Sequence, residues 1–470
     1  MSASRSIVET RPHGSERAVH PERLLERAGL AAPGSQPGPG PGSAAGTRAA
    51  EPTAIAGPVA GWRARRARMA AGLLGRLVER LHADGLDIVD VDGTRWSSPA
   101  RAGTPRPTLC VRDERAWWAV ASEGSVGLGR GYLERWWTTD DPTGVVRVLI
   151  RNLEPLDEVR NRLQRVSGWA VDPVRRRVGR SSRERDRDNV QSHYDLGNDF
   201  FELFLDETMT YSSAVFEHPS VPLAQASTHK YDVLLGKLGV EADHHLLEVG
   251  SGWGGLALRA AGRTGCRVTT ATVSARQAVE ARRRIAAAGL DDRVDVVERD
   301  WRLLAGRFDR IVSIEMIEAL HWRDYERYFA TLGRCLRPDG LVGIQAILAP
   351  DRRYERVKHT EDFIRRFVFP GGHLPSLGAI SRAAGRASRL QIVDVEDFSA
   401  HYAETLRRWR TRFDSRLDEV RALGLDERFV RLWRFYLAYC EAAFLERHCT
   451  VAQIVLAGPQ WRPDGLGRLG

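Results

Sequence analysis

Strand and helix patterns alternate through the middle of this chain, and this alternation constrains the fold more than any other feature. Short apolar runs typical of buried strands lie at 246–250, 267–272, 294–298, 308–314 and 341–347. Helical patterns accompany them at 231–238, 254–263, 274–288 and 322–336. Such alternation predicts a doubly wound α/β fold, in which helices cover both faces of a parallel sheet. Ligands of these sheets bind beyond the carboxyl ends of the strands, so we expect functional residues just after each strand.

A glycine-rich turn follows the first of these strands. Gly250, Gly252 and Gly254 have no Cβ, so a ligand can lie directly on the backbone. The N–H groups that open the next helix have no partner within that helix and suit polar or anionic ligand groups. Glu248 places an acidic residue at the start of the turn. By itself the turn also fits another kind of nucleotide-binding loop, or a tight connection that binds nothing.

Composition narrows the class of partner. The chain has 470 residues, enough for two or three domains. Its 70 lysines and arginines outnumber its 61 acids, which favours nucleic acid or an acidic lipid surface as partner. The five cysteines are scattered, so we expect no disulfide framework and no metal site. No apolar run reaches about 18 residues and no secretory signal is recognisable, so we expect a cytoplasmic protein with at most peripheral membrane contact.

Two biased segments divide the chain. Residues 1–58 are rich in Gly, Pro, Ala and Arg and predict a disordered tail, without the aromatic residues that would support nucleic-acid binding. Residues 174–189 contain seven arginines and predict a basic linker. The folded units are therefore expected at 60–173 and 190–470.

The first unit, 60–173, is predicted to combine helices and strands. Residues 62–82 have the pattern of a basic amphipathic helix, which either packs on its own domain or lies on an anionic bilayer. A β-rich stretch is expected after it, with strands at 108–111 and 117–120.

Four further motifs make the chain resemble a known family. The glycine turn itself resembles the loop that cradles S-adenosylmethionine in class I methyltransferases. The additional motifs lie at 193–201, 209–214, 272–277 and 369–376. Together they resemble the cyclopropane-fatty-acyl-phospholipid synthase family, including the mycolic acid cyclopropane synthases, over roughly residues 100–460. The resemblance implies a class I methyltransferase (Rossmann-like) sheet with added helices, preceded by a smaller α+β domain that associates with lipid.

The resemblance also implies S-adenosylmethionine as cofactor and assigns residues to it. The expected contacts are Tyr211 and Ser212 from preceding helices, Glu248, Gly250, Gly252 and Gly254 along the methionine part, Thr272, Val273 and Gln277 near the ribose, and Asp300 and Trp301 near the adenine. Most of these residues follow the end of a predicted strand, as the fold requires. For Thr272 and Gln277 the alternative is an ordinary helix cap and a surface amide.

The reaction implied by the resemblance is methyl transfer to the cis double bond of unsaturated acyl chains in membrane phospholipids. An alkene is a weak nucleophile, so water must be excluded. Aromatic faces can stabilise the resulting carbocation. Removal of a proton from the new methyl group with ring closure gives a cyclopropane fatty acid, the expected product. Removal after a hydride shift gives a 10-methylene chain, which another enzyme can reduce to a methyl branch, and this is the main alternative.

The residues expected to hold the base depart from the family pattern. In typical members the base is bicarbonate, held by a cysteine, a glutamate, a histidine and a tyrosine. Here Glu318 and Tyr402 match, whereas Ser213 stands in the cysteine position and Gln345 in the histidine position. Because two of the four ligands differ, the resemblance leaves bicarbonate as a doubtful cofactor.

Glu315 is a carboxylate one helical turn before Glu318, at a position usually occupied by a small residue in the family. One hypothesis is that Glu315 supplies a built-in base in place of bicarbonate, since a carboxylate in an apolar cavity is a stronger base than one in water. The alternative is a solvated or salt-bridged loop residue.

Partners and location follow from the same resemblance. We expect peripheral association with the anionic inner face of the plasma membrane, no nucleic acid, and a homodimer. Two other function classes remain open: a methyltransferase for small soluble molecules, and a non-catalytic lipid-binding homologue.

Overall fold

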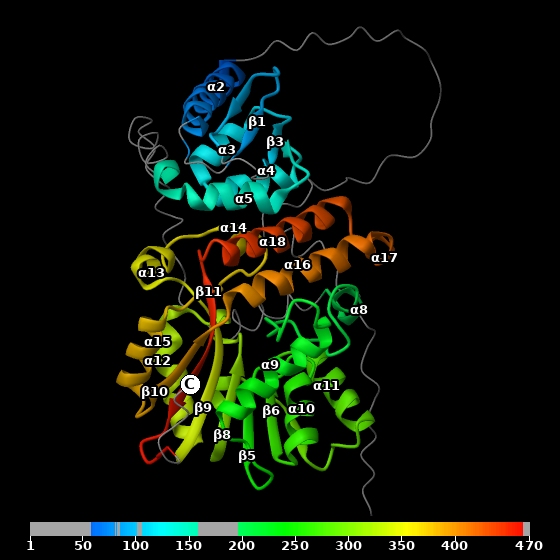
Figure 1. Cartoon of the computed structure of the whole chain (residues 1–470), viewed down its shortest axis with the longest axis vertical. Helices are drawn as coiled ribbons and strands as arrows, with labels where there is room; N and C mark the ends of the chain where they lie inside the picture. Colours follow the sequence, from blue (N-terminus) through cyan, green and yellow to red (C-terminus); the bar gives the residue numbers. More distant parts are fainter. Residues whose placement is uncertain (1–57, 80, 82–84, 101–105, 158–195, 464–470) are drawn as a thin grey trace, which may run out of the picture.

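A computed structural model describes residues 58–79, 81, 85–100, 106–157 and 196–463. It consists of two units stacked along the long axis of the molecule (Figure 1). The expected tail, up to residue 57, and the expected linker at 174–189 lie outside the described residues, as does the start of the motif at 193–201.

The larger unit is built on a seven-stranded sheet. Its strands are β5 (His245–Val249), β6 (Arg267–Thr272), β7 (Val294–Glu298), β8 (Phe308–Ile314), β9 (Leu336–Leu348), β10 (Gln391–Asp397) and β11 (Thr450–Ala457). They lie in the order β10-β11-β9-β8-β5-β6-β7. The strands from β9 to β7 are parallel, and β11 runs antiparallel between β9 and β10. Chain order reverses beside β5 and β8, the point where ligands bind in such sheets.

Helices cover both faces of this sheet, as predicted. On one face lie α9 (Leu223–Lys237), α10 (Gly255–Thr264) and α11 (Ala275–Ala287), and on the other α12 (Tyr325–Cys335) and α15 (Leu377–Ala387). Leu246 and Val312 belong to the first core, whereas their neighbours Leu247 and Ile311 belong to the second. Successive strand residues are therefore all buried, which explains the unbroken apolar runs in the sequence.

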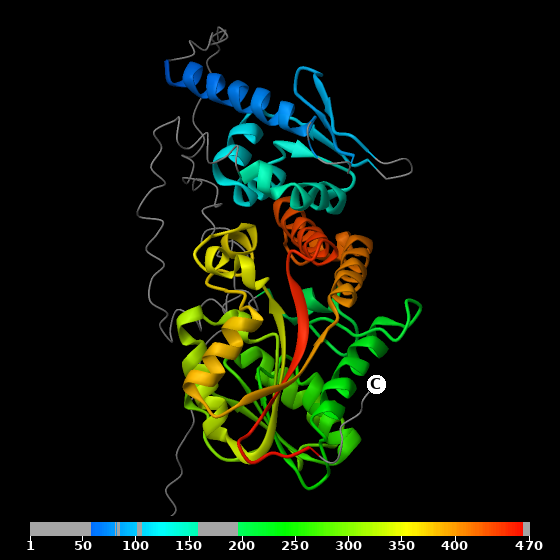
Figure 2. The same cartoon turned by 60° about the vertical axis from the view of Figure 1, so that its left-hand side comes forward.

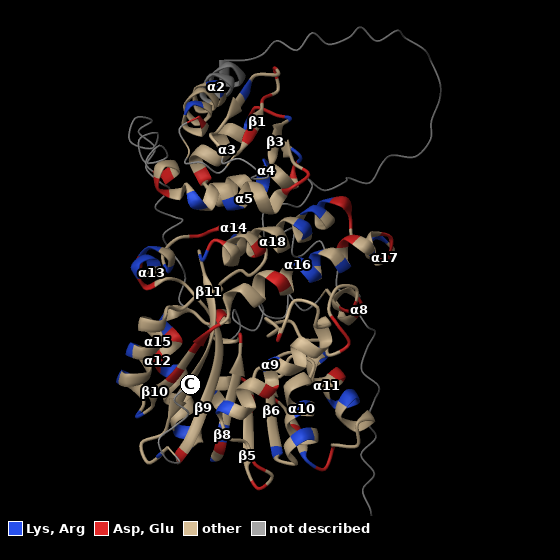
Figure 3. Cartoon of the chain, viewed as in Figure 1, with Lys and Arg blue, Asp and Glu red and all other residues tan. Residues whose placement is uncertain are grey.

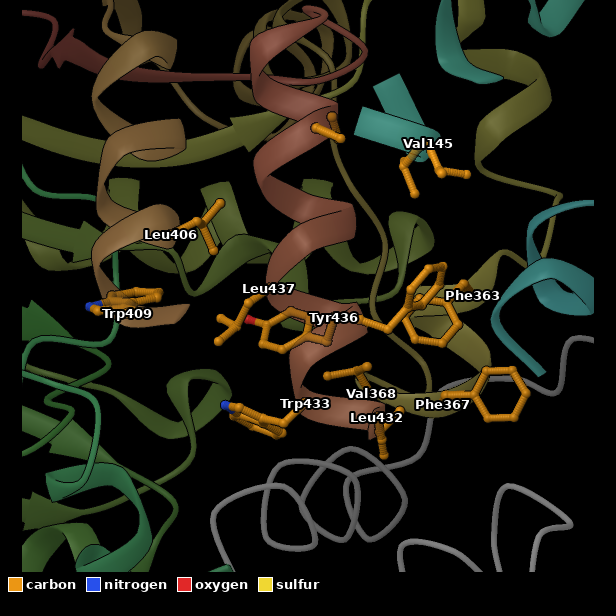
Figure 4. Packing of buried hydrophobic residues seen from close by; sticks show 14 of the residues in the cluster. Val145, Phe363, Phe367, Val368, Leu406, Trp409, Leu432, Trp433, Tyr436 and Leu437 are labelled. Atoms are coloured by element: carbon orange, nitrogen blue, oxygen red, sulfur yellow. The ribbon is translucent and has the colours of Figure 1, made fainter. Parts of the chain in front are cut away.

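A layer of helices, here called the helical cap, lies over the carboxyl ends of the strands (Figure 1). Its members are α8 (Asn198–Glu202), α13 (Asp351–Val357), α14 (Phe363–Phe367), α16 (Ser399–Ser415), α17 (Leu417–Ala422) and α18 (Glu427–Leu445). Short 3₁₀ turns lie below it at Trp301–Leu303, Ile317–Ala319 and Trp322–Asp324. In Figure 4, Trp409 of α16 and Trp433 and Tyr436 of α18 are among the buried side chains at the centre of this layer.

The smaller, N-terminal unit is an α+β fold, as predicted. Its strands β1 (Asp87–Val89), β2 (Arg95–Ser97), β3 (Thr108–Val111) and β4 (Trp137–Thr138) form a sheet of order β2-β1-β3-β4. Its helices are α2 (Pro58–Val78), α3 (Arg115–Glu123), α4 (Ser125–Leu133) and α5 (Pro142–Arg151). The strand expected at 117–120 is wrong, since these residues lie inside α3. The alanines of that segment favour a helix and outweigh the β-prone Trp and Val residues beside them.

The two units share one hydrophobic core. Val145 of α5, Phe363 of α14 and Phe435 of α18 belong to the same buried cluster. At its edge Arg147 and Arg151 of α5 both pair with Glu446 at the end of α18, each at 2.6 Å. The N-terminal unit therefore packs on the helical cap, on the side away from the large sheet (Figure 2). Within the described ranges, no helix has both the length and the apolarity that crossing a bilayer requires.

Candidate active site

The predicted site residues follow the carboxyl ends of four neighbouring strands. Gly250 follows β5, Val273 follows β6, Asp300 follows β7 and Glu315 follows β8. These ends point toward the helical cap (Figure 1). The sheet thus brings together segments that are up to 65 positions apart in sequence, as the alternating pattern predicted.

All three glycines of the turn adopt the left-handed backbone conformation, with φ of +98° at Gly250, +49° at Gly252 and +83° at Gly254. A Cβ on Gly250 would lie 3.2 Å from Met316, and one on Gly254 would lie 3.2 Å from Ala281. A Cβ on Gly252 would meet no atom within 4 Å. The first and third glycines therefore allow close packing, whereas the second leaves open space for a ligand.

Glu248 lies within β5 and is buried. Its carboxylate accepts a hydrogen bond from Thr270 Oγ1 on β6 at 2.6 Å. Burial raises the pKa of Glu248 to about 8, against the opposing effects of the Thr270 hydrogen bond and the charge of Lys230. In the protein without ligand, this acid is therefore mostly protonated at neutral pH.

The segment after β6 forms the cap of α11. Thr272 Oγ1 donates to Gln277 Oε1 at 3.0 Å and accepts from Ser274 N at 3.1 Å. Ser274 Oγ accepts from Gln277 N and caps the helix. Thr272 holds the backbone of the capping residue but does not itself cap the helix, and Gln277 is buried, so the alternative of a helix cap and a surface amide is wrong for both. Val273 is partly exposed beside them.

The segment after β7 is held by an ion pair. Asp300 accepts from the backbone N of Arg302 at 2.8 Å and from its guanidinium at 2.9 Å. The guanidinium lies over the ring of Trp301, 4.7 Å from its centroid. These contacts fix Trp301, which is almost fully buried, at the edge of the site.

Glu315 lies at the centre of a cluster of hydrogen-bond donors. Its Oε1 accepts from Ser213 N at 2.9 Å and from Gln345 Nε2 at 2.8 Å, and its Oε2 accepts from Tyr402 OH at 2.6 Å. The hydroxyl of Ser213 instead donates to the Ala214 carbonyl. The structure thus brings four of the five sequence-predicted catalytic residues together around one carboxylate. Among the described residues no cation forms an ion pair with Glu315, so the alternative of a salt-bridged residue is wrong.

Glu318, the fifth candidate, lies close to this cluster. Its Oε1 accepts from the backbone N of Ile347, two residues beyond Gln345, and its buried Oε2 has no partner among the described residues. Burial and then the negative charge of Glu315 raise the pKa of Glu318 to about 8. Burial also raises the pKa of Glu315, against the opposing effects of Lys230 and its hydrogen-bond donors. As whole residues, Glu315 and Glu318 are each partly exposed, as expected of residues that line a binding site.

Aromatic rings from the helical cap, and Tyr211 from the segment after α8, lie beside the cluster. Tyr211 OH and Tyr436 OH are hydrogen-bonded at 2.9 Å. The ring of Trp409 lies 5.4 Å from that of Tyr211 and 6.2 Å from that of Tyr402, between centroids. Ser212, next to Tyr211, is buried and accepts from Lys230 Nζ at 2.6 Å.

Two polar residues of the site were not predicted. Lys230 on α9 and Gln453 on β11 are both fully buried. Lys230 lies four residues after Ala226 and four before Leu234, which both lie on the buried face of α9. A charged residue at that spacing is the signal that could have identified it. The pairing of β11 with β9 places the Gln453 side chain beside Gln345, and no local pattern reveals that pairing.

Comparisons with known proteins identify relatives of the chain. A family model described as mycolic acid cyclopropane synthetase matches residues 181–454. The chain is 40% identical to tuberculostearic acid methyltransferase UfaA1 of Mycobacterium tuberculosis, over 84% of this chain and 93% of that protein. It is 32% identical to cyclopropane-fatty-acyl-phospholipid synthase of Escherichia coli, over 77% and 88%. The crystal structure of mycolic acid cyclopropane synthase CmaA1 complexed with SAH and CTAB is similar with a TM-score of 0.54 and 32% identity, over 58% and 98%.

Proposed function

The chain belongs to the mycolic acid cyclopropane synthetase family and is an S-adenosylmethionine-dependent methyltransferase, and on this premise we propose that it methylates the double bond of unsaturated acyl chains in membrane phospholipids. The observation that carries the proposal is the carboxylate of Glu315, which three donors hold beside the glycine turn. A base in that place suits a reaction that ends with loss of a proton from carbon.

The described residues fit S-adenosylmethionine. Open space over Gly252 leaves room for a ligand on the backbone of the turn. Glu248, Thr272, Gln277 and Trp301 lie at or after the carboxyl ends of three neighbouring strands. On this proposal they hold the methionine, ribose and adenine parts of the cofactor. When bound, the cofactor supplies an electrophilic methyl group carried on a sulfonium.

Aromatic rings beside Glu315 suit the next stage of the proposed reaction, in which a carbocation forms on the acyl chain. The π electrons of the acyl double bond form the new carbon–carbon bond, which leaves a positive charge on the neighbouring carbon of the acyl chain. The rings of Tyr211, Trp409 and Tyr436 offer electron-rich faces for such a charge. Since these side chains are mostly buried and Tyr211 contacts both of the others, they also exclude water that would trap the cation.

Glu315 then takes the proton. A C–H bond of the acyl chain's new methyl group breaks and the proton moves to the Glu315 carboxylate. The electron pair of that bond forms a new bond to the cationic carbon, which closes a ring or, after a hydride shift, gives a methylene double bond. Ser213 N, Gln345 and Tyr402 hold that carboxylate in place beforehand. Glu318, mostly protonated at neutral pH, adds little repulsion. In this proposal Glu315 fills the place that bicarbonate has in typical relatives.

We favour a methylene or methyl-branched product over a ring. The supporting observation is the 40% identity, over nearly the full length, to a relative named as a methyltransferase for tuberculostearic acid. Cyclopropane formation is the second candidate, supported by the 32% identity to a cyclopropane-fatty-acyl-phospholipid synthase. Both outcomes take a proton from the same methyl group, so they differ in whether a hydride shifts first.

The N-terminal unit offers a surface for membrane contact. On α2 the exposed residues Arg68, Met69, Leu73 and Arg76 lie on one face of the helix, with Met69 50% and Leu73 42% exposed. Two apolar side chains flanked by arginines suit an anionic bilayer. Three further arginines lie on α13 of the helical cap (Figure 3). We propose that these surfaces hold the protein peripherally on the inner face of the membrane.

The test is transfer of labelled methyl. The full-length purified protein is incubated with methyl-labelled S-adenosylmethionine and vesicles of monounsaturated phosphatidylglycerol, and the fatty acids are analysed by mass spectrometry. We expect acyl chains heavier by one CH2, and their susceptibility to hydrogenation then distinguishes a methylene from a ring. Label found only in soluble acceptors, or no transfer at all, would contradict the proposal and support a small-molecule methyltransferase or a non-catalytic homologue.

A further inference from the structure

Lys230 is a buried cation that the mechanism above does not use. Its side chain is fully enclosed within the larger unit, on the inner face of α9. Nζ donates to Ser212 Oγ at 2.6 Å and lies 4.5 Å from the centroid of the Tyr231 ring. Among the described residues, no carboxylate forms an ion pair with it. A buried ammonium group without a direct counter-ion is costly, so its presence calls for a reason.

Burial lowers the pKa of Lys230 to about 8, and three carboxylates at a longer distance oppose that fall. Among these carboxylates Glu315 has the largest effect, followed by Asp206 and Glu248. Asp206 is already hydrogen-bonded to Ser227 Oγ at 2.8 Å, and Glu248 is satisfied by Thr270 of β6. The proposed base is therefore the negative charge that Lys230 faces most strongly.

Both ends of Lys230 connect to the donors that hold Glu315. At the side-chain end, Ser212 accepts from Nζ, and the next residue, Ser213, donates its N–H to Glu315. At the backbone end, the carbonyl of Lys230 accepts from Gln453 Nε2 at 3.2 Å.

Gln453 completes the second connection. The same Nε2 donates to Gln345 Oε1 at 3.3 Å, across the paired strands β11 and β9. With its oxygen engaged in this way, Gln345 must present its NH2 group to Glu315, as observed at 2.8 Å. The position of Lys230 is thus coupled to two of the three donors around the base.

We propose that Lys230 is a positioning residue whose buried charge keeps Glu315 ionised and ready to accept a proton. The inference rests on the proposed role of Glu315 as base. It assigns no proton transfer to Lys230 itself, which acts through its charge and through Ser212 and Gln453.

The expected direction follows from the groups around Glu315. Loss of hydration raises the pKa of Glu315, and Lys230, Tyr402, Gln345 and the Ser213 N–H oppose that rise. The other titratable group near Glu315 is Glu318, whose pKa is raised to about 8, so it is mostly neutral near pH 7. Without the Lys230 charge, the pKa of Glu315 rises further, and a larger share of the enzyme carries a protonated, inactive base.

The test is the pH profile of kcat at saturating cofactor for the wild type, Lys230→Met and Lys230→Arg. We expect the acid limb of Lys230→Met to move to higher pH. Below the limb, activity should fall about tenfold for each pH unit by which the limb moves. Activity should recover at alkaline pH, where Glu315 ionises without help. Lys230→Arg keeps the charge and should keep the limb. A defect that is merely structural would lower activity equally at every pH.

Two additions keep the test decisive. If Lys230→Met does not fold, Lys230→Gln replaces it as a neutral variant that can still donate to Ser212. Titration of carboxyl-labelled glutamate by NMR, with Glu315→Gln to assign the signal, reads the pKa of Glu315 without any turnover. A folded neutral variant whose acid limb and NMR titration match those of the wild type overturns the inference.

Failure of this inference can be told apart from failure of the proposed function. If Glu315→Gln is inactive while the neutral Lys230 variants keep the wild-type profile, only the role of Lys230 is lost. If Glu315→Gln retains full activity in bicarbonate-depleted buffer, Glu315 is not the base and both proposals fall.

Discussion

At the scale of single residues, the backbone of Glu315 is as informative as its side chain. Its φ of +47° lies in the left-handed region, which costs a residue with a Cβ about 1 kcal/mol. Such strain at a buried polar centre persists only where the surroundings enforce it. Here the Glu315 N–H donates to the Gln345 carbonyl at 2.8 Å, while three donors hold the carboxylate. Glycine would occupy this position without strain.

This geometry predicts that Glu315→Gly exchanges a built-in base for a soluble one. The variant should lose activity in bicarbonate-depleted buffer and regain part of it when bicarbonate or formate is added, because the donors from Ser213, Gln345 and Tyr402 remain around a vacated anion position. Glu315→Gln, which fills the same space, is the control and should show no rescue. Equal responses of the two variants to added anion would contradict the prediction.

At the scale of elements, the sequence predicted the strands that are buried on both faces. Unbroken apolar runs bounded by glycines placed β5 to β8 within one residue of their observed ends. The edge strand β10 and its neighbour β11 were not predicted, since β10 is mostly exposed and β11 follows a long helix. The pattern within helix α3 wrongly predicts a strand. Lys230 and Gln453 were missed for a related reason: their contact with the site depends on long-range packing and on the pairing of β11 with β9.

The shared core between α4, α5, α14 and α18 predicts that the two units unfold together. Phe435 of α18 is fully buried, and its ring lies 4.9 Å from that of Tyr132 in the N-terminal unit and 4.9 Å from that of Phe363. Phe435→Ala should therefore lower the free energy of unfolding by about 3–5 kcal/mol. In urea, fluorescence and circular dichroism should still report one coincident transition.

A matched control for that experiment is Val393→Ala on the exposed edge strand β10, where the side chain is 45% exposed. This variant should leave the transition where it is in the wild type. Two separate transitions in Phe435→Ala, with only one of them displaced, would show that the units are energetically independent.

At the scale of the whole molecule, the exposed face of α2 should govern membrane binding. This face, here called the stripe, consists of Arg68, Met69, Leu73 and Arg76. Replacing Met69 and Leu73 together by Gln removes the apolar contact and should weaken binding to anionic vesicles, measured by co-sedimentation, while leaving the fold intact. Binding of the wild type should also weaken as salt is raised, because the arginines act through screened charge. Leu423→Gln, at a 41% exposed position at the end of α17, is the control. Equal binding by the stripe variant and the control would contradict this role.

The carboxylates of the site also make global stability depend on pH. In the cofactor-free protein the pKa values of Glu248 and Glu318 are both about 8, raised by burial from an ordinary 4.5. A raised pKa means that the folded state binds protons more tightly than the unfolded chain. The contribution of these groups is therefore complete below about pH 4.5 and is lost as the pH rises toward about 8.

Urea unfolding of the wild type and Glu318→Gln at several pH values between about 5 and 8 measures this linkage. The neutral variant should become progressively more stable relative to the wild type as the pH rises. Parallel pH dependence in the two proteins would mean that Glu318 does not titrate in this range.

The left-handed backbone at Glu315 carries an evolutionary consequence. Two glycine codons, GGA and GGG, become glutamate codons through a single nucleotide transition. A site whose backbone favours glycine at this position can therefore acquire a permanent carboxylate in one mutational step. The hydrogen-bond donors that would bind a dissolved anion there can then bind that carboxylate. On our proposal, an enzyme that depends on dissolved bicarbonate and one that carries its own base are separated by a single nucleotide substitution.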